Sequence, residues 1–278
     1  MLCKMLLWDF KNGIKNRLYC LYFPLVIAGI TFTIGYYNIV KVEKMPNLLS
    51  FGNLYVFIYG GMVEYIPAPG NYFIFPGLWL IMMLIPAYMV LSYPIKDFVG
   101  MGKMILVQGQ TRTLWWISKC VWNVVMTVLF HGIVSITIFL LTFFITGRIS
   151  FQVDGKLQGI LFSLPLDREP IEDIELSFAL IVLPLLYSVA INLLEMLLAF
   201  YLKQTFSFLS ILILSLIGAY LYHPFMISNY AMLIRNKVIH PTGMESRLGY
   251  CILVILVLLV VVIGQRYLSK KDIMEKET

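Results

Sequence analysis

The chain has 278 residues, of which 60% are hydrophobic and 13% are charged. A soluble domain carries about 25% charged residues, so this composition excludes a water-soluble globular protein. The formal net charge of +6 is spread unevenly along the chain, and we interpret it as a signal for membrane orientation rather than for nucleic-acid binding. The sequence therefore predicts an all-α integral membrane protein that forms a single domain over residues 1–278.

The N-terminal stretch, residues 1–17, is too polar to cross a membrane but has an amphipathic pattern. Lys4, Lys11 and Lys15 share one face of a helix, and Phe10 lies mostly away from it. This pattern predicts an amphipathic helix that lies in the cytoplasmic interface of the membrane. A frayed basic N-terminus is the alternative.

Six apolar segments are long enough to cross a bilayer, which requires about 20 helical residues. They cover residues 18–40, 76–95, 113–147, 176–202, 206–227 and 248–267. Of the 21 lysines and arginines, more lie on the side of these segments that holds both termini than on the opposite side. By the positive-inside rule, we expect both termini in the cytoplasm and the protein in the cell membrane.

Two stretches on the predicted outer side are neither spans nor ordinary loops. Residues 41–75 are rich in aromatic residues and glycine, too interrupted to cross the bilayer and too apolar for a free loop. We expect them to form a short helix or hairpin packed at the outer surface. Residues 228–247 also contain apolar residues, and we expect this loop to dip back toward the membrane.

The connection between the second and third spans is long, mixed in character and rich in basic residues. Asp97 lies at the C-terminal end of the second span, where unpaired carbonyls disfavour an anion, so we expect it to have a partner. Gly100 and Gly102 are expected to break the helix. Residues 103–110 then allow about two helical turns, which contain Lys103 and the apolar residues Met104, Ile105, Leu106 and Val107.

The third span begins with a pattern of cations and tryptophans. The spacing of Arg112, Trp116, Lys119 and Asn123 places them on one helix face. The three tryptophans of this stretch, Trp115, Trp116 and Trp122, are expected to form an aromatic belt at the lipid headgroups. Two interpretations remain open: an interfacial anchor with snorkelling cations, or a support for a short helix that docks a soluble partner.

Polar residues within the apolar segments are the other candidates for function. Glu195 is the one carboxylate well inside a span, and Asn192 shares its helix face. Glu195 could carry a proton, pair with a group on a neighbouring helix, or reach the inner interface. We expect His131 in the third span to be a hydrogen-bonded structural residue, and it could face Glu195 if the third and fourth spans are adjacent.

The sequence shows neither a phosphate-binding loop nor a hydrolase motif. The four cysteines are scattered, and the sequence shows no set of metal ligands. We therefore expect no enzyme activity and no cofactor in this chain. If the protein moves a substrate uphill, the energy must come from an ion gradient or from another polypeptide.

The layout and one segment, YPIKDFVGMGKMILVQGQTRTLWWISK, resemble the permease subunit of an ATP-binding-cassette (ABC) transporter, of the six-span export class called type V. The segment is similar to the family's link between spans two and three, with an acid, a short helix, and an Arg and a Lys seven residues apart. The resemblance implies that residues 103–110 are a coupling helix that docks on a separate ATPase.

The same resemblance implies a working unit of two permeases, identical or paralogous, and two ATPase subunits that bind ATP and Mg. The expected activity is export of a peptide, a drug or a lipid-like amphiphile, including multidrug or peptide resistance. Two alternatives remain: a proton-coupled secondary transporter that uses Glu195, and a non-transporting sensor or immunity protein that captures a peptide on the aromatic residues 51–75.

Overall fold

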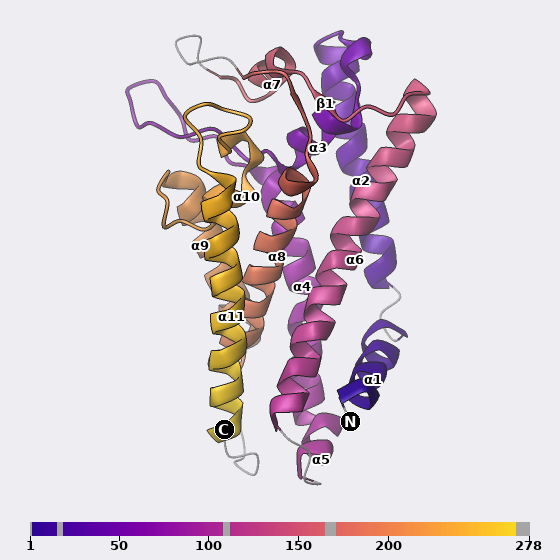
Figure 1. The fold of residues 1–278 in the computed structure, drawn as a ribbon, viewed down its shortest axis with the longest axis vertical. Helices are drawn as coiled ribbons and strands as arrows, with labels where there is room; N and C mark the ends of the chain where they lie inside the picture. The colour runs from indigo at the N-terminus through magenta and orange to yellow at the C-terminus, as the bar shows by residue number, and fades with distance from the viewer. Residues whose placement is uncertain (1, 16–18, 108–111, 165–170, 271–278) are drawn as a thin grey trace.

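The computed structural model describes residues 2–15, 19–107, 112–164 and 171–270, which form an elongated bundle of helices (Figure 1). In this part of the chain, five helices are long and apolar enough to cross a membrane. They are α2 (Tyr19–Tyr36) with its π-helical continuation η1 (Tyr37–Val42), α4 (Gly77–Val99), α6 (Arg112–Thr146), α8 (Phe178–Leu198) and α11 (Ser246–Lys270). The protein is thus a helical, multi-pass membrane protein, as its composition predicted.

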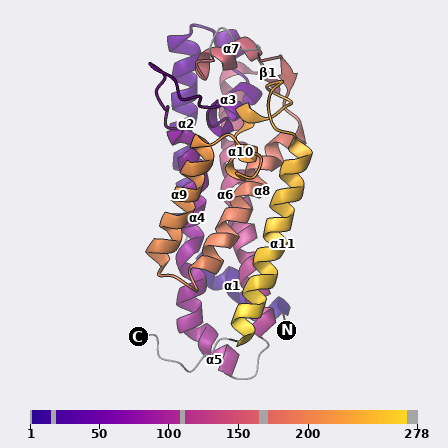
Figure 2. The same cartoon turned by 90° about the vertical axis from the view of Figure 1, so that its left-hand side faces the viewer.

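The bundle is organised around α8, the most buried of these five helices. It packs against α4, α6 and α11, and against a shorter apolar helix, α9 (Gln204–Tyr220). Figure 2 shows α8 between α9 and α11. Helix α2 lies outside this group and packs on α6. Because α8 is apolar on nearly every side, it is the helix that can be surrounded by others.

The two ends of the bundle carry different short elements (Figure 1). One end, which we call the α5 end, holds α1 (Leu2–Lys15), α5 (Met101–Val107) and the last turn of α11. The other, the α7 end, holds η2 (Pro46–Leu48), α3 (Phe51–Tyr59), α7 (Gly155–Leu161), α10 (Ser228–Ala231) and η3 (Leu233–Arg235), with the strands β1 (Gln152–Val153) and β2 (Ile174–Glu175). The strands pair antiparallel, Gln152 opposite Glu175.

The helix predicted within residues 41–75 is present as α3, which lies at the α7 end and is packed into the bundle. Eight of its nine residues are buried, and it packs against α2, α4 and α6. At Gly52 a Cβ atom would lie 2.4 Å from the carbonyl oxygen of Phe151, so glycine permits this close packing. The Tyr55 hydroxyl donates to the carbonyl of Ile181 on α8 (3.0 Å), which supplies the polar contact that a buried phenol needs.

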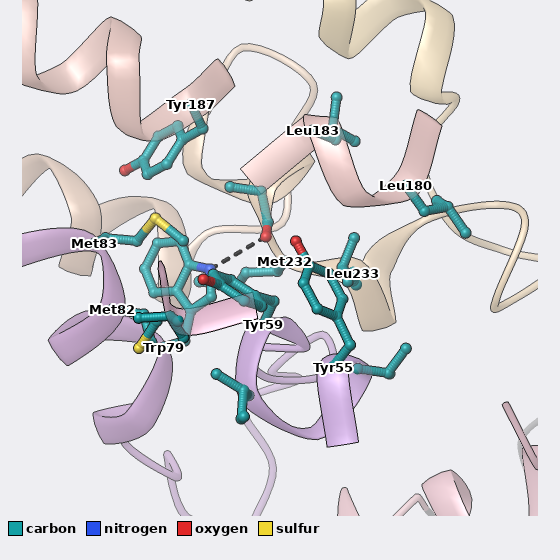
Figure 3. Close-up of a cluster of buried hydrophobic side chains, with 14 of the residues drawn as sticks. Tyr55, Tyr59, Trp79, Met82, Met83, Leu180, Leu183, Tyr187, Met232 and Leu233 are labelled. Atoms are coloured by element: carbon teal, nitrogen blue, oxygen red, sulfur yellow. Dashed lines mark hydrogen bonds between the residues drawn. The ribbon is translucent and has the colours of Figure 1, made fainter. Parts of the chain in front are cut away.

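Aromatic and sulfur-containing side chains fill the space between α3, α4 and α8 (Figure 3). The ring of Trp79 stacks on that of Tyr187, with centroids 5.8 Å apart. The Trp79 indole nitrogen donates to the carbonyl of Ala231, 3.2 Å away. This bond connects α4 to α10, so the start of the 228–247 loop packs on the bundle.

The fifth predicted span, residues 206–227, is too long. Helix α9 ends at Tyr220, and Leu221 is extended. Arg235 accounts for this end, because its guanidinium donates to the carbonyls of Gly218 (3.0 Å) and Ala219 (2.7 Å) in the last turn of α9. These carbonyls cannot be satisfied within a helix that stops at Tyr220. A distant loop therefore sets the boundary of this helix.

Arg235 also donates to the carbonyls of Met62 (2.8 Å) and Val63 (3.0 Å) and to the side chain of Asn229. It is 2% exposed. Burial lowers the pKa of Arg235 to about 10, so it stays protonated at neutral pH. One cation thus joins residues 62–63, the end of α9 and the loop after α10.

We predict that Arg235→Met lowers the free energy of unfolding by several kcal/mol, because each buried acceptor left without a donor costs about 1–3 kcal/mol. The thermal unfolding midpoint of the purified protein in detergent would report the loss. Lys237→Met is the control, since Lys237 and Glu245 form an exposed ion pair at 3.3 Å worth less than about 1 kcal/mol. Equal midpoints for the two variants would contradict the role of Arg235.

Candidate functional site

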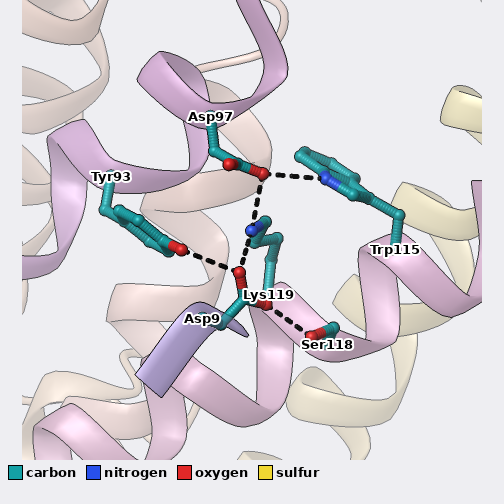
Figure 4. A network of polar contacts seen from close by, with 6 residues as sticks. All are labelled: Asp9, Tyr93, Asp97, Trp115, Ser118 and Lys119. Atoms are coloured by element: carbon teal, nitrogen blue, oxygen red, sulfur yellow. Dashed lines mark hydrogen bonds and ion pairs between the residues drawn. The ribbon is translucent and has the colours of Figure 1, made fainter. Parts of the chain in front are cut away.

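The candidate site lies at the α5 end, where α1, α4 and α6 meet (Figure 4). Lys119 of α6 forms ion pairs with Asp9 of α1 and with Asp97 of α4, the latter at 2.7 Å. The side chains of Asp9, Asp97 and Lys119 are 2%, 7% and 1% exposed. The expected partner of Asp97 therefore exists, and it is Lys119.

Neutral donors complete this ionic cluster, which holds two carboxylates for one ammonium group. The Tyr93 hydroxyl donates to Asp9 (2.7 Å), as does the Ser118 hydroxyl. The Trp115 indole donates to Asp97 (3.0 Å). The Lys119 nitrogen also lies 4.7 Å from the centre of the Tyr93 ring. Buried charges are tolerated when they are paired and hydrogen-bonded in this way.

The aromatic belt was predicted wrongly, and of the two interpretations left open, the one with a snorkelling Lys119 does not fit the structure. Trp115, Trp116 and Trp122 are 2%, 0% and 0% exposed and lie inside the protein. The Trp116 indole donates to the carbonyl of Val261 on α11 (2.9 Å). Were Lys119 to turn toward lipid, Asp9 and Asp97 would lose their only close cation in the described structure. The helix face predicted to meet lipid is therefore the interior face.

The break expected between α4 and α5 is confirmed at Gly100 but not at Gly102. Helix α4 continues to Val99, and α5 begins at Met101 and includes Gly102. A Cβ atom at Gly102 would lie 2.6 Å from an Asp97 carboxylate oxygen and 2.9 Å from the Trp115 indole nitrogen. Glycine at this position lets α5 lie directly against the ionic cluster.

The predicted short helix, residues 103–110, is observed as α5, which begins earlier; residues 108–110 lie outside the described part. Leu106 is 7% exposed and packs in a cluster with Phe98 and Trp115. Met104 and Met101, in contrast, are 63% and 51% exposed. Lys103 is half-buried. Ile105 and Val107 belong to α5, but their side chains are outside the described set. Helix α5 therefore has one anchored face and one exposed apolar face.

Arg112, at the first residue of α6, contacts the C-terminal end of α11. Its guanidinium donates to the carbonyls of Leu268 (3.3 Å) and Ser269 (2.9 Å). A cation is favourable there because the last carbonyls of a helix carry partial negative charge. With the indole bond of Trp116, this contact fastens α11 to the start of α6.

The polar residues inside the spans form a separate group. The Asn192 side-chain nitrogen donates to the Thr127 hydroxyl (2.8 Å), and that of Asn123 donates to the carbonyl of Asn192 (3.2 Å). His131 shares a hydrogen bond with the hydroxyl of Tyr59 (2.8 Å), so the hydrogen bond predicted for it is present. Glu195 is fully buried inside the protein.

No contact between Glu195 and His131 appears among the described residues. Thr127 and Asn192 mark one level of the bundle. His131 lies one turn beyond Thr127 on α6, and Glu195 lies about one turn beyond Asn192 on the antiparallel α8, so the two diverge from that level. The structure therefore assigns them different surroundings.

Sequence reasoning missed Asp9, Tyr93 and Ser118. Asp9 is the only acidic residue in the otherwise basic α1. An acid is unfavourable in a helix that lies on anionic lipid, so its presence was a signal that Asp9 pairs with another group of the protein. Tyr93 precedes Asp97 by four residues, so both occupy one face of α4. Ser118 has no comparable signal.

A family of proteins of unknown function, DUF2705, matches residues 61–274. The chain belongs to the DUF2705 family. A comparison with curated proteins finds no match. The DUF2705 match includes α4, α5, α6, α8 and α11, and hence Asp97, Arg112 and Lys119, but it begins after α1 and Asp9.

We predict that Lys119→Met destabilises this DUF2705 protein by about 3–5 kcal/mol, because it leaves two buried carboxylates without a cation. Thermal unfolding in detergent would measure the effect. Adding Asp97→Asn and Asp9→Asn to Lys119→Met removes all three charges and should recover part of the loss. A triple variant less stable than Lys119→Met would show that charge imbalance is not the cause.

Proposed function

We propose that this protein is the membrane-spanning permease subunit of an ABC transporter, driven by a separate ATPase that binds ATP and Mg. The observation that carries the proposal is α5, which combines an exposed apolar face with a rigid attachment to the bundle. An exposed methionine-rich surface is adaptable and suits protein contact. A rigid attachment is what transmits a push from one protein to another.

The attachment of α5 reaches most of the bundle. Helix α5 continues directly from α4 through Gly100, and Leu106 is packed beside Trp115 of α6. The ionic cluster connects α4 and α6 to α1, and Arg112 connects α6 to α11. A displacement of α5 by an ATPase would therefore move several spans together rather than bend a loop.

The proposal includes a topology. We assign α9 as a further span, which brings the number of spans to six. Its 17 residues extend about 26 Å, slightly less than the roughly 30 Å hydrocarbon core. Basic residues are more frequent toward the α5 end, so we place that end, both termini and the ATPase in the cytoplasm of the cell. Two permeases, identical or paralogous, and two ATPases would make the working unit.

The substrate class that fits is an amphiphile, a drug or a peptide. At the α7 end a cavity of about 300 Å³ lies among residues 57–79 and 161–163. Its lining is largely apolar and aromatic, including Phe57, Trp79 and Phe162, with Glu64 and Asn71 among its few polar groups. Small-molecule sites typically have this size and composition. A second candidate function, peptide capture without transport, is favoured by the same cavity.

We predict that Met104→Asp abolishes co-purification of an ATPase with the tagged protein while membrane insertion and thermal stability stay unchanged. Met104 is exposed, so the aspartate would place a charge in the apolar contact that we propose between α5 and the ATPase. Tyr72→Asp is the matched control, because Tyr72 is 83% exposed at the α7 end, and it should retain the ATPase. Leu106 is unsuitable for this test, since it is buried and its replacement would disturb folding.

An ATPase bound equally by wild type and Met104→Asp would contradict the proposed docking face. Absence of any ATPase with the wild-type protein would favour peptide capture. The topology has its own measurement, in which Met104→Cys is placed in a background without native cysteines. A membrane-impermeant maleimide should label this cysteine only after the cells are permeabilised.

A further inference from the structure

Glu195 is buried within α8, and its carboxyl group has no hydrogen-bond partner among the described residues. Its exposed fraction is 0%, and neither carboxyl oxygen accepts or donates a hydrogen bond. The side-chain oxygens of Asn123 and Asn192 are likewise buried and without a partner. Glu195 follows Asn192 by three residues on the same helix, so these groups belong to one region of the α6–α8 contact.

The donors in this region are already used. The Asn123 amide donates to the backbone of Asn192, and the Asn192 amide donates to Thr127. The Thr127 hydroxyl donates to the carbonyl of Asn123 (2.9 Å). The side-chain atoms of Asn123, Asn192 and Glu195 that have no partner are all oxygens, so what these three residues lack is a hydrogen-bond donor or a cation.

The ionisable residues on the elements packed against α8 do not supply one. Within the described structure, no lysine, arginine or histidine nitrogen lies within 4.0 Å of the Glu195 carboxyl group. The ionisable residues of these elements are Tyr88, Tyr93, Lys96 and Asp97 on α4, Arg112, Lys119, Cys120 and His131 on α6, Tyr220 on α9, Tyr230 on α10, and Arg247, Tyr250, Cys251, Arg266, Tyr267 and Lys270 on α11.

The nearest candidates among them have other partners. Lys119 is paired with Asp9 and Asp97, and His131 is bonded to Tyr59. A carboxylate with no cation and no donor is very costly inside a membrane protein, whereas a neutral carboxylic acid is not. The acid form also provides an O–H donor where several acceptors lack one.

We propose that Glu195, together with Asn123 and Asn192, is an intramembrane proton-binding site that holds a proton at neutral pH. The proton binds one carboxyl oxygen and is released to water as a hydronium ion when the site ionises. Lys119, Asn123, Thr127 and His131 follow one another at four-residue spacing along α6, so the site lies beside a polar strip that begins at the ionic cluster. The inference does not depend on the permease proposal.

Infrared spectroscopy of the purified full-length protein tests the inference without any substrate or ATPase. A protonated carboxyl group has a C=O band distinct from carboxylate bands. At neutral pH the wild-type protein should show this acid band, and Glu195→Gln should lose it. Glu175→Gln is the control, because Glu175 is exposed, and its replacement should leave the acid band of the wild-type protein unchanged.

A second measurement uses stability. As the pH rises from neutral to alkaline, ionisation of Glu195 puts an unpaired charge in the interior, so the thermal midpoint of the wild type should fall more than that of Glu195→Gln. The neutral amide keeps the side-chain shape. Identical acid-band spectra for wild type and Glu195→Gln would overturn the inference. So would sodium binding by the wild-type protein that is lost in Glu195→Gln, because the site would then hold a metal cation.

Discussion

The ion pairs of Lys119 with Asp9 and Asp97 are the constraint on which the α5 end of this molecule depends. A buried lysine cannot be left alone in an apolar interior, and neither can the two carboxylates. Satisfying all three forces α1, α4 and α6 to meet at one point. Trp115 is held inside as well, because its indole donates to the Asp97 carboxylate. The orientation of α5 follows from this cluster through Gly102.

A buried cation also joins distant segments at the α7 end, but its partners are of a different kind. There the cation is Arg235, and its partners are mostly backbone carbonyls rather than carboxylates. Arginine suits this task because its planar guanidinium offers several donors in fixed directions. Between the two ends, helices pack through aromatic and aliphatic side chains, and the Asn123–Thr127–Asn192 contact joins α6 to α8. Each end of the bundle therefore has one buried cation that joins chain segments distant in sequence.

The contacts at the two ends distinguish residues that hold the helices together from residues that stay exposed. Lys119, Arg112 and Leu106 are used internally, so they hold α5 in place and do not meet a partner directly. Among the α5 side chains that the structure describes, Met101 and Met104 are the exposed apolar ones. Glu195 differs from the other buried acids, since Asp9 and Asp97 have a cation and donors whereas Glu195 has neither. Acidic side chains therefore serve as structural ions in one place and, by our inference, as a proton-binding group in another.

The sequence by itself determined the helical membrane class, the approximate limits of most spans, the short helix after Gly100 and the need of Asp97 for a partner. These features depend on apolar length and on local helix chemistry, which neighbouring residues encode. Only the tertiary structure decided that the tryptophans face inward, that α3 is buried, that α9 stops at Tyr220 and that Asp9 is the third member of the ionic cluster. An apolar helix face has the same sequence pattern whether lipid or protein covers it. Contacts between distant segments leave no pattern in the local sequence.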